Sequence, residues 1–229
     1  MRSKRLSLLL CICLVCALFT SCTDKGKGGE KDREYDEAEV CAAAKLLIEK
    51  SKILNEIYYG AGIPYKKPIK EDAKIDKYML ADPDYLAELN KNYGIKDIET
   101  LKAKTKEVYS ETGSASVISA FLGNTVGING YAGYVRYYMA KENADLGTPG
   151  GLMVNTQAKN YYENTVSVEY IYDGMRVSAV KGEYLTVSLK VKTTGKDGTA
   201  DTRETTVKLI EEESGYRLSG ATYAFHPQS

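Results

Sequence analysis

The spacing of apolar positions divides the chain, after its first 34 residues, into a helical half and a strand-rich half. Over 35–59 the apolar side chains recur every three or four residues, which predicts one long helix with a buried stripe that ends at Gly60. Segments with the same period follow Asp82, Asp97 and Ser114, so three shorter helices are predicted there. The second of these four helices is expected to bury Tyr93 and to end at Gly94.

From residue 131 the period changes to two, which is typical of strands with one buried face. Asp173-Gly174 predicts a two-residue hairpin turn between strands at 166–172 and 175–180. Helices followed by antiparallel strands joined by short loops predict an α+β domain over 35–229, with a helical part at 35–123 and an antiparallel sheet at 131–225. This order resembles the NTF2-like and cystatin-like rolls. The resemblance implies that the helices pack on one face of a curved sheet.

The first 22 residues have the parts of a secretory signal. A basic head at 1–5 precedes 14 uncharged and almost entirely apolar residues, Leu6–Phe19, which are fewer than the roughly 20 that span a membrane. Thr20-Ser21-Cys22 then resembles the lipobox of bacterial lipoproteins, with Phe19 where Leu is commoner. The resemblance implies cleavage between Ser21 and Cys22 and a diacylglycerol on the Cys22 sulfur. Two alternatives stay open, namely an ordinary Cys22 thiol after a cut elsewhere, and an uncleaved anchor.

Residues 22–34 follow as the lipidated cysteine and a glycine-rich charged tether with no apolar side chain after Cys22. The expected location is therefore the cell membrane, with a lipid-anchored domain facing outside the cytoplasm. Two acyl chains supply the double hydrophobic signal that stable anchoring needs.

The charge of the chain limits its expected partners, and its cysteine content limits the disulfide bonds that it can form. Residues 1–21 hold three of the 31 basic residues and none of the 31 acidic ones, so the remainder has a net charge of −3 and nucleic acid is not an expected partner. Besides Cys22, the expected mature chain has one cysteine, Cys41, on the apolar stripe of the long helix. Cys41 is interpreted as a small buried hydrophobe, and no internal disulfide is expected.

A second resemblance covers residues 47–139. The segments 54–60 (LNEIYYG), 62–65 (GIPY), 108–110 (VYS) and Arg136-Tyr137 resemble a family of uncharacterised lipoproteins from Gram-positive anaerobes. More loosely, a helical lobe with a cystatin-like sheet is similar to the secreted inhibitors of DL-endopeptidase autolysins. These resemblances imply location and fold, and they carry no catalytic residues.

The residues that usually carry catalysis are scarce. The one histidine, His226, is the fourth residue from the end, so neither a histidine-based nucleophile device nor a zinc site is expected. The aspartates at 72, 76, 82 and 84 lack a calcium-loop spacing, and no phosphate-binding glycine loop occurs. The sequence therefore predicts no metal, no cofactor and no enzyme. The alternative left open is an NTF2-like enzyme that uses carboxylate or tyrosine acid–base residues.

Four residues are candidates for a binding cleft between helix and sheet. Tyr58, Tyr59 and Tyr65 surround the predicted helix end, and Arg136 lies among strand tyrosines. A guanidinium over tyrosine rings could hold an anionic group, whereas the structural interpretation, which we favour, is core packing and local pairing. Function is thus expected to be non-catalytic binding of an envelope protein or small ligand. Inhibition of cell-wall DL-endopeptidases is the alternative binding role.

Overall fold

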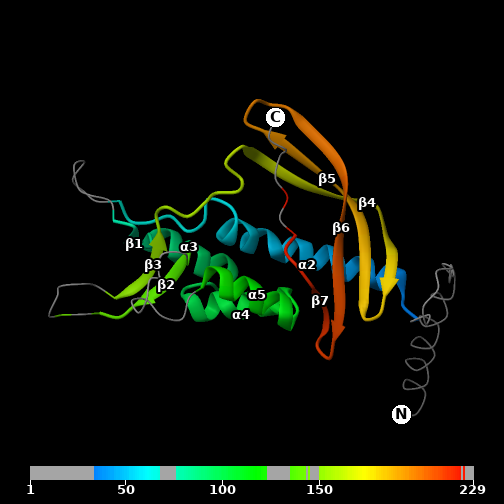
Figure 1. Cartoon of the computed structure of the whole chain (residues 1–229), viewed down its shortest axis with the longest axis horizontal. Coiled ribbons are helices and arrows are strands. Elements are labelled where there is room, and N and C mark those ends of the chain that lie inside the picture. The colour runs from blue at the N-terminus through cyan, green and yellow to red at the C-terminus, as the bar shows by residue number, and fades with distance from the viewer. Residues whose placement is uncertain are drawn as a thin grey trace, which may run out of the picture. The chain divides into compact units, whose positions relative to one another are not determined.

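The computed structural model describes residues 34–67, 76–122, 135–142, 144, 150–222 and 224. The chain divides into Met1–Asp36 and Glu37–Ser229, and every helix and strand given below belongs to the second unit (Figure 1). The predicted signal, Cys22 and most of the tether lie outside the described residues, as does His226. Among the helices that the structure describes, none combines the length and apolar character that crossing a membrane requires.

In the described residues of the first half the structure forms four helices, as the period of three and four predicted. The helices are α2 (Glu37–Tyr58), α3 (Pro83–Tyr93), α4 (Ile98–Val108) and α5 (Glu111–Phe121). Asp82 caps α3 with Pro83 in its first turn, and Asp97 forms a capping box with Thr100 at the start of α4. Such caps satisfy amides that a helix leaves without partners, so these starts were encoded locally.

Two details of the helical prediction are wrong. Gly60 was expected to take the left-handed conformation that ends α2, but Gly62 takes it, with φ of 80°. The helix end instead closes through Gly60 N–H to Asn55 O at 3.0 Å. Tyr93 was placed on the buried side of α3, yet 47% of it is exposed, because α3 buries little besides Leu89.

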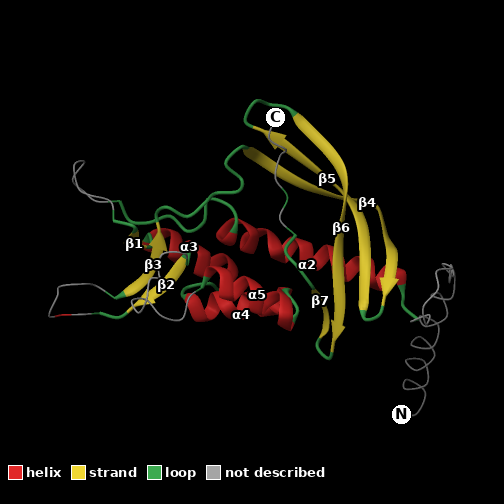
Figure 2. Ribbon diagram, viewed as in Figure 1, coloured by secondary structure: helices red, strands yellow, loops and turns green. Residues whose placement is uncertain are grey.

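The strands form two antiparallel sheets where the sequence predicted one (Figure 2). The smaller sheet has the order β1-β3-β2 and includes a short strand, β1, that the alternation of residues did not predict. The larger sheet has the order β4-β5-β6-β7. The bounds are β1 (Tyr78–Leu80), β2 (Tyr137–Ala140), β3 (Gly151–Asn155), β4 (Thr165–Lys181), β5 (Tyr184–Gly195), β6 (Ala200–Glu212) and β7 (Gly215–Leu218).

The predicted hairpin at Asp173-Gly174 is wrong, because β4 runs through it as one strand. The pairing with β5 passes from Ile171↔Lys190 to Arg176↔Ser188, so four residues of β4 face a single residue, Leu189. Gly174, with φ of 73°, sits in this bulge. An irregularity of this kind bends a strand without reversing it, and β5 pairs with both halves of β4.

The larger sheet buries one face, as its alternation predicted. Register pairs Leu185 with Leu209 and Val187 with Val207, and all four side chains are buried. Helix α2 packs against β4 and β7, and Figure 1 shows the long strands of this sheet bending. The predicted α+β class, with helices on one face of a curved antiparallel sheet, is confirmed.

Candidate functional site

The candidate residue Arg136 lies just before β2 and is 4% exposed. Its guanidinium donates hydrogen bonds to the carbonyls of Tyr58, at 2.6 Å, and Gly60, at 2.5 Å, and more weakly to Lys159 O at 3.4 Å. The last carbonyls of a helix carry partial negative charge, so a cation there satisfies them and complements the helix dipole. Arg136 therefore fixes the carboxyl end of α2.

Tyr137 and the loop around Gly62, which follows α2, also contact this helix end. The Tyr137 hydroxyl donates to Ile57 O at 2.7 Å and accepts from Ile63 N at 3.0 Å. A Cβ on Gly62 would lie 2.4 Å from the Tyr137 oxygen and 2.5 Å from a nitrogen of Arg136. The loop that follows α2 thus passes too close to these groups for any side chain at position 62.

The three candidate tyrosines make structural contacts. Tyr58 is fully buried, and its hydroxyl pairs with Thr105 Oγ1 at 2.7 Å. Tyr59 stacks edge-on against Phe121, with ring centroids 5.1 Å apart, and Tyr65 forms a β-bridge with Ala81. The structure brings Tyr58, Tyr59 and Arg136 together at the end of α2.

The space between α2 and the sheet holds residues 219–222, here called the C-terminal segment, which follow β7. Figure 1 shows this segment running back past α2 after β7. The Thr222 hydroxyl pairs with Ser51 Oγ at 2.6 Å and accepts from Asn55 Nδ2 at 3.1 Å. The Tyr170 hydroxyl donates to the Thr222 carbonyl. These buried polar groups therefore satisfy one another, as buried groups must.

Tyrosines around this segment hold their protons. Burial raises the pKa of Tyr170 to about 12, although its hydrogen bond with Thr222 opposes the shift. Burial also raises the pKa values of Tyr109 and Tyr162. At neutral pH these hydroxyls act as hydrogen-bond donors and acceptors, and none is poised to exchange a proton.

One carboxylate–tyrosine pair lies at the flank of the helix–sheet contact. Tyr172 Oη donates to Glu49 Oε1 at 2.6 Å. Partial burial would raise the pKa of Glu49, but hydrogen bonds from Lys52 and Tyr172 outweigh it and hold that pKa below its usual range. Burial and Glu49 raise the pKa of Tyr172. Both values are shifted away from neutrality, the opposite of what an acid–base pair needs.

Beside the C-terminal segment the helix–sheet space stays open as a hollow of about 420 Å³. One wall is the start of β4, with Thr165, Val166, Ser167, Val168 and Tyr170. The facing wall includes Lys52, Asn55 and Glu56 of α2, and Ala61, Asn160 and Tyr162 complete the lining. None of the four candidate cleft residues lines it.

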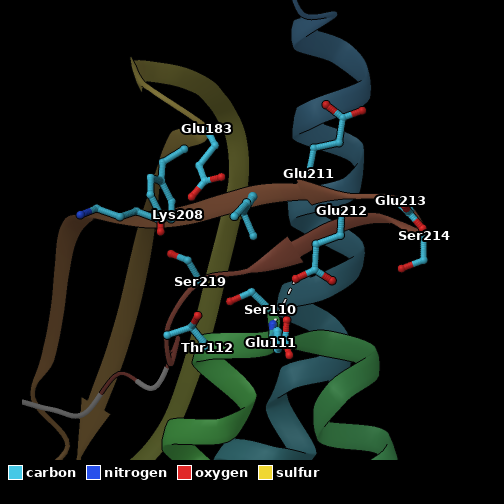
Figure 3. Close-up of a pocket in the computed structure, with 12 residues that line it drawn as sticks. Ser110, Glu111, Thr112, Glu183, Lys208, Glu211, Glu212, Glu213, Ser214 and Ser219 are labelled. Carbon is cyan, nitrogen blue, oxygen red and sulfur yellow. Dashed lines mark hydrogen bonds between the residues drawn. The ribbon is translucent and has the colours of Figure 1, made fainter.

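A larger hollow, of about 830 Å³, lies where the start of α5 meets the β6–β7 turn (Figure 3). Its lining includes five glutamates, at positions 111, 183, 211, 212 and 213, and one lysine, Lys208. Glu212 Oε1 accepts the backbone N–H of Glu111 at 3.1 Å, so a carboxylate of the chain already occupies the helix start. Among the described residues no cluster of three or more cysteine, histidine or acidic side chains could hold a metal ion.

Comparison with protein-family models gives no match, and comparison with curated proteins gives none either. Among solved structures, the chain is similar to the iota-carbonic anhydrase from a cyanobacterium complexed with bicarbonate. The TM-score is 0.28 and the identity 16%, over 89% of this chain and 99% of that one. At that TM-score the likeness carries no argument about fold or chemistry.

Sequence reasoning missed the residues that line the helix–sheet space. Asn55 and Ser51 lie on the buried face of α2, where polar residues need partners, and this was the one available signal. Nothing local indicated that their partner would be Thr222, which is 171 residues from Ser51. Cys41, interpreted as a buried hydrophobe, is half-buried, and its thiol donates to Met175 O at 3.7 Å.

Proposed function

We propose that this protein is a lipoprotein, anchored to the membrane by a lipid on Cys22, with a non-catalytic binding role outside the cytoplasm. The anchor rests on the basic head, the short apolar run and the Thr20-Ser21-Cys22 sequence. The tether would hold the domain near the membrane, and twelve flexible residues span roughly 20 Å.

The observation that carries the non-catalytic role is the occupation of the helix–sheet space by the C-terminal segment. The polar groups that face this space, on Ser51, Asn55 and Tyr170, are hydrogen-bonded to Thr222. An acid–base centre needs at least one such group left available to a substrate, with a pKa near neutrality. The shifts at Glu49 and Tyr172 run in the other direction.

The anchor is tested by the mass of the mature amino terminus. The expected mass is that of a chain beginning at Cys22 with a diacylglycerol attached, and a Cys22→Ser variant should lose the lipid and leave the membrane fraction. Cys41→Ser is the matched control, because it removes the other cysteine expected in the mature chain and should keep both lipid and membrane. A Cys22→Ser protein that stays tightly bound to membranes would contradict the anchor.

The binding role is tested on the cell wall. Inhibition of DL-endopeptidases is its most specific version, and the purified protein should then slow digestion of peptidoglycan by the cell's own endopeptidases. Heat-unfolded protein at the same concentration is the control. Digestion at an unchanged rate would contradict inhibition of DL-endopeptidases.

A further inference from the structure

One row of α2 side chains covers the outer edge of β4 over its second half. Glu37 Oε1 accepts the backbone N–H of Val177 at 2.8 Å, and the Cys41 thiol donates to Met175 O. Residues four apart share a helix face, so these contacts belong to one continuous row. The row supplies hydrogen-bond partners to an edge that would otherwise offer its main chain to another strand.

The same row continues toward the middle of β4. Lys45 Nζ lies 5.2 Å from the centre of the Tyr172 ring, and Lys52 Nζ lies 5.8 Å from the centre of the Tyr170 ring. Glu49 accepts the Tyr172 hydroxyl between them. From Tyr170 to Val177, therefore, side chains of α2 lie against β4.

Beyond Tyr170, toward the start of β4, the cover ends and the 420 Å³ hollow begins. Four consecutive residues of this edge strand, Thr165–Val168, line the hollow, so main chain as well as side chains borders it. Within the described part of the chain no main-chain group of another segment hydrogen-bonds to the Val166–Val168 main chain on the side away from β5. Val166 is 67% exposed although it is apolar.

The adjoining part of the same space already holds polypeptide. Tyr170 and Asn55 line the hollow, and the same two side chains bind the carbonyl and the hydroxyl of Thr222. This contact shows the kind of ligand that these walls accept, namely main-chain carbonyls and small hydroxyl side chains.

We propose that the groove between α2 and the Val166–Val168 edge, the α2–β4 groove, binds an extended peptide segment of a partner protein by strand addition. Peptides that add a strand to a sheet edge gain affinity from main-chain hydrogen bonds and specificity from alternate side chains. Three residues of strand cover about 10 Å. The inference goes beyond the anchor and stands without it.

The residues that line the groove also determine which peptide side chains it can bind. Lys52 is paired with Glu49 at 2.7 Å, and Glu56 Oε1 accepts the Ala61 N–H at 2.9 Å, so both charged side chains that line the groove already have a partner within the chain. A charged peptide residue would lose water there without gaining a partner. The partner segment is therefore uncharged, with small or β-branched residues such as Thr and Val facing Val166 and Val168.

The test uses the lipidated protein purified in detergent and a display library of seven-residue peptides drawn from Thr, Val, Ser and Ile. Selected peptides are synthesised, and their affinity is measured by fluorescence polarisation. Methylation of alternate peptide nitrogens should weaken binding by about tenfold or more, because it removes main-chain donors and leaves the side chains unchanged. Val166→Lys should weaken binding by at least as much, since a charge on an exposed edge blocks strand addition.

Thr206→Lys is the matched control, because Thr206 is exposed on β6, which β5 separates from β4 and its groove, and affinity should stay within about twofold. The inference is overturned if the library yields no binder, or if binding survives both N-methylation and Val166→Lys. Sedimentation gives a further outcome, because a dimer that Val166→Lys dissociates would assign the edge to a second copy instead. None of these results bears on the lipid at Cys22, which is tested separately by the mass of the mature amino terminus.

Discussion

Replacing Arg136 by methionine should strongly destabilise the domain. Methionine keeps an unbranched side chain in the buried site but removes the donors to Tyr58 O and Gly60 O. A hydrogen bond to a charged group contributes about 1.5–3 kcal/mol. Two of them, together with carbonyls left buried without partners, give an expected loss of about 3–5 kcal/mol, against the 5–15 kcal/mol that holds a typical domain folded.

The loss is measured as the free energy of unfolding in urea, followed by far-ultraviolet circular dichroism. Arg136→Lys should lose about half as much, because a lysine keeps the charge but not the planar fork that reaches two carbonyls. Arg176→Met is the matched control on an exposed residue of β4 and should stay within about 0.5 kcal/mol of the wild type. If Arg136→Met unfolds at the same urea concentration as Arg176→Met, the guanidinium does not stabilise the helix end and the reasoning fails.

Three further predictions concern single contacts. Gly62→Ala and Gly174→Ala both place a side chain at positive φ, which costs about 1–2 kcal/mol, but a Cβ meets close atoms only at Gly62, so that variant should be the less stable of the two in urea. Thr222→Val should cost about 2 kcal/mol and speed amide exchange after β7, because it removes the hydroxyl that two buried side chains of α2 share; unchanged exchange would contradict the contact. Hydrogen bonds from Thr100 lower the pKa of Asp97, so Asp97 stabilises the fold above its unfolded pKa of about 3.9 and loses that contribution as pH falls through the lower folded value. Asp97→Asn keeps the cap and should match the wild type at pH 7, while its urea midpoint should fall less between pH 4 and pH 2.

The features that the sequence predicted correctly are those whose causes lie within a few residues. Asp82 with Pro83 and Asp97 with Thr100 mark helix starts because each cap bonds to amides two or three residues away. Alternation over β5 and β6 predicted a buried face for the same reason, since neighbouring positions on a strand point to opposite sides.

The hairpin at Asp173-Gly174 failed because a turn signal is local and strand pairing is not. The dipeptide can reverse a chain, but β5 offers partners to residues on both sides of it, from Thr165↔Gly195 to Lys181↔Tyr184. The chain therefore absorbs Gly174 as a bulge within a longer strand. No pattern within 165–181 distinguishes these two outcomes.

The site depended on contacts that no local pattern carries. Arg136 bonds to a carbonyl 78 residues earlier, and Asn55 bonds to Thr222, 167 residues later. The tyrosines around Arg136 favoured a structural role and left anion binding as the alternative, but they did not indicate that the guanidinium bonds to carbonyls at the end of α2. Only the path of the C-terminal segment decides which part of the helix–sheet space is filled.

The fixed helix end and the open groove are parts of one arrangement. The α2–β4 groove takes one wall from the last turns of α2, and Arg136 holds the carbonyls at the end of those same turns without lining the groove. A peptide that adds to an edge loses less affinity to ordering when the facing wall is already rigid. Arg136→Lys, which keeps the fold at a lower stability, should therefore weaken the binding of a selected peptide by several-fold, whereas Arg176→Met, on the far half of β4, should not. If the two variants bind the peptide with equal affinity, peptide binding in the groove does not depend on how Arg136 holds the end of α2.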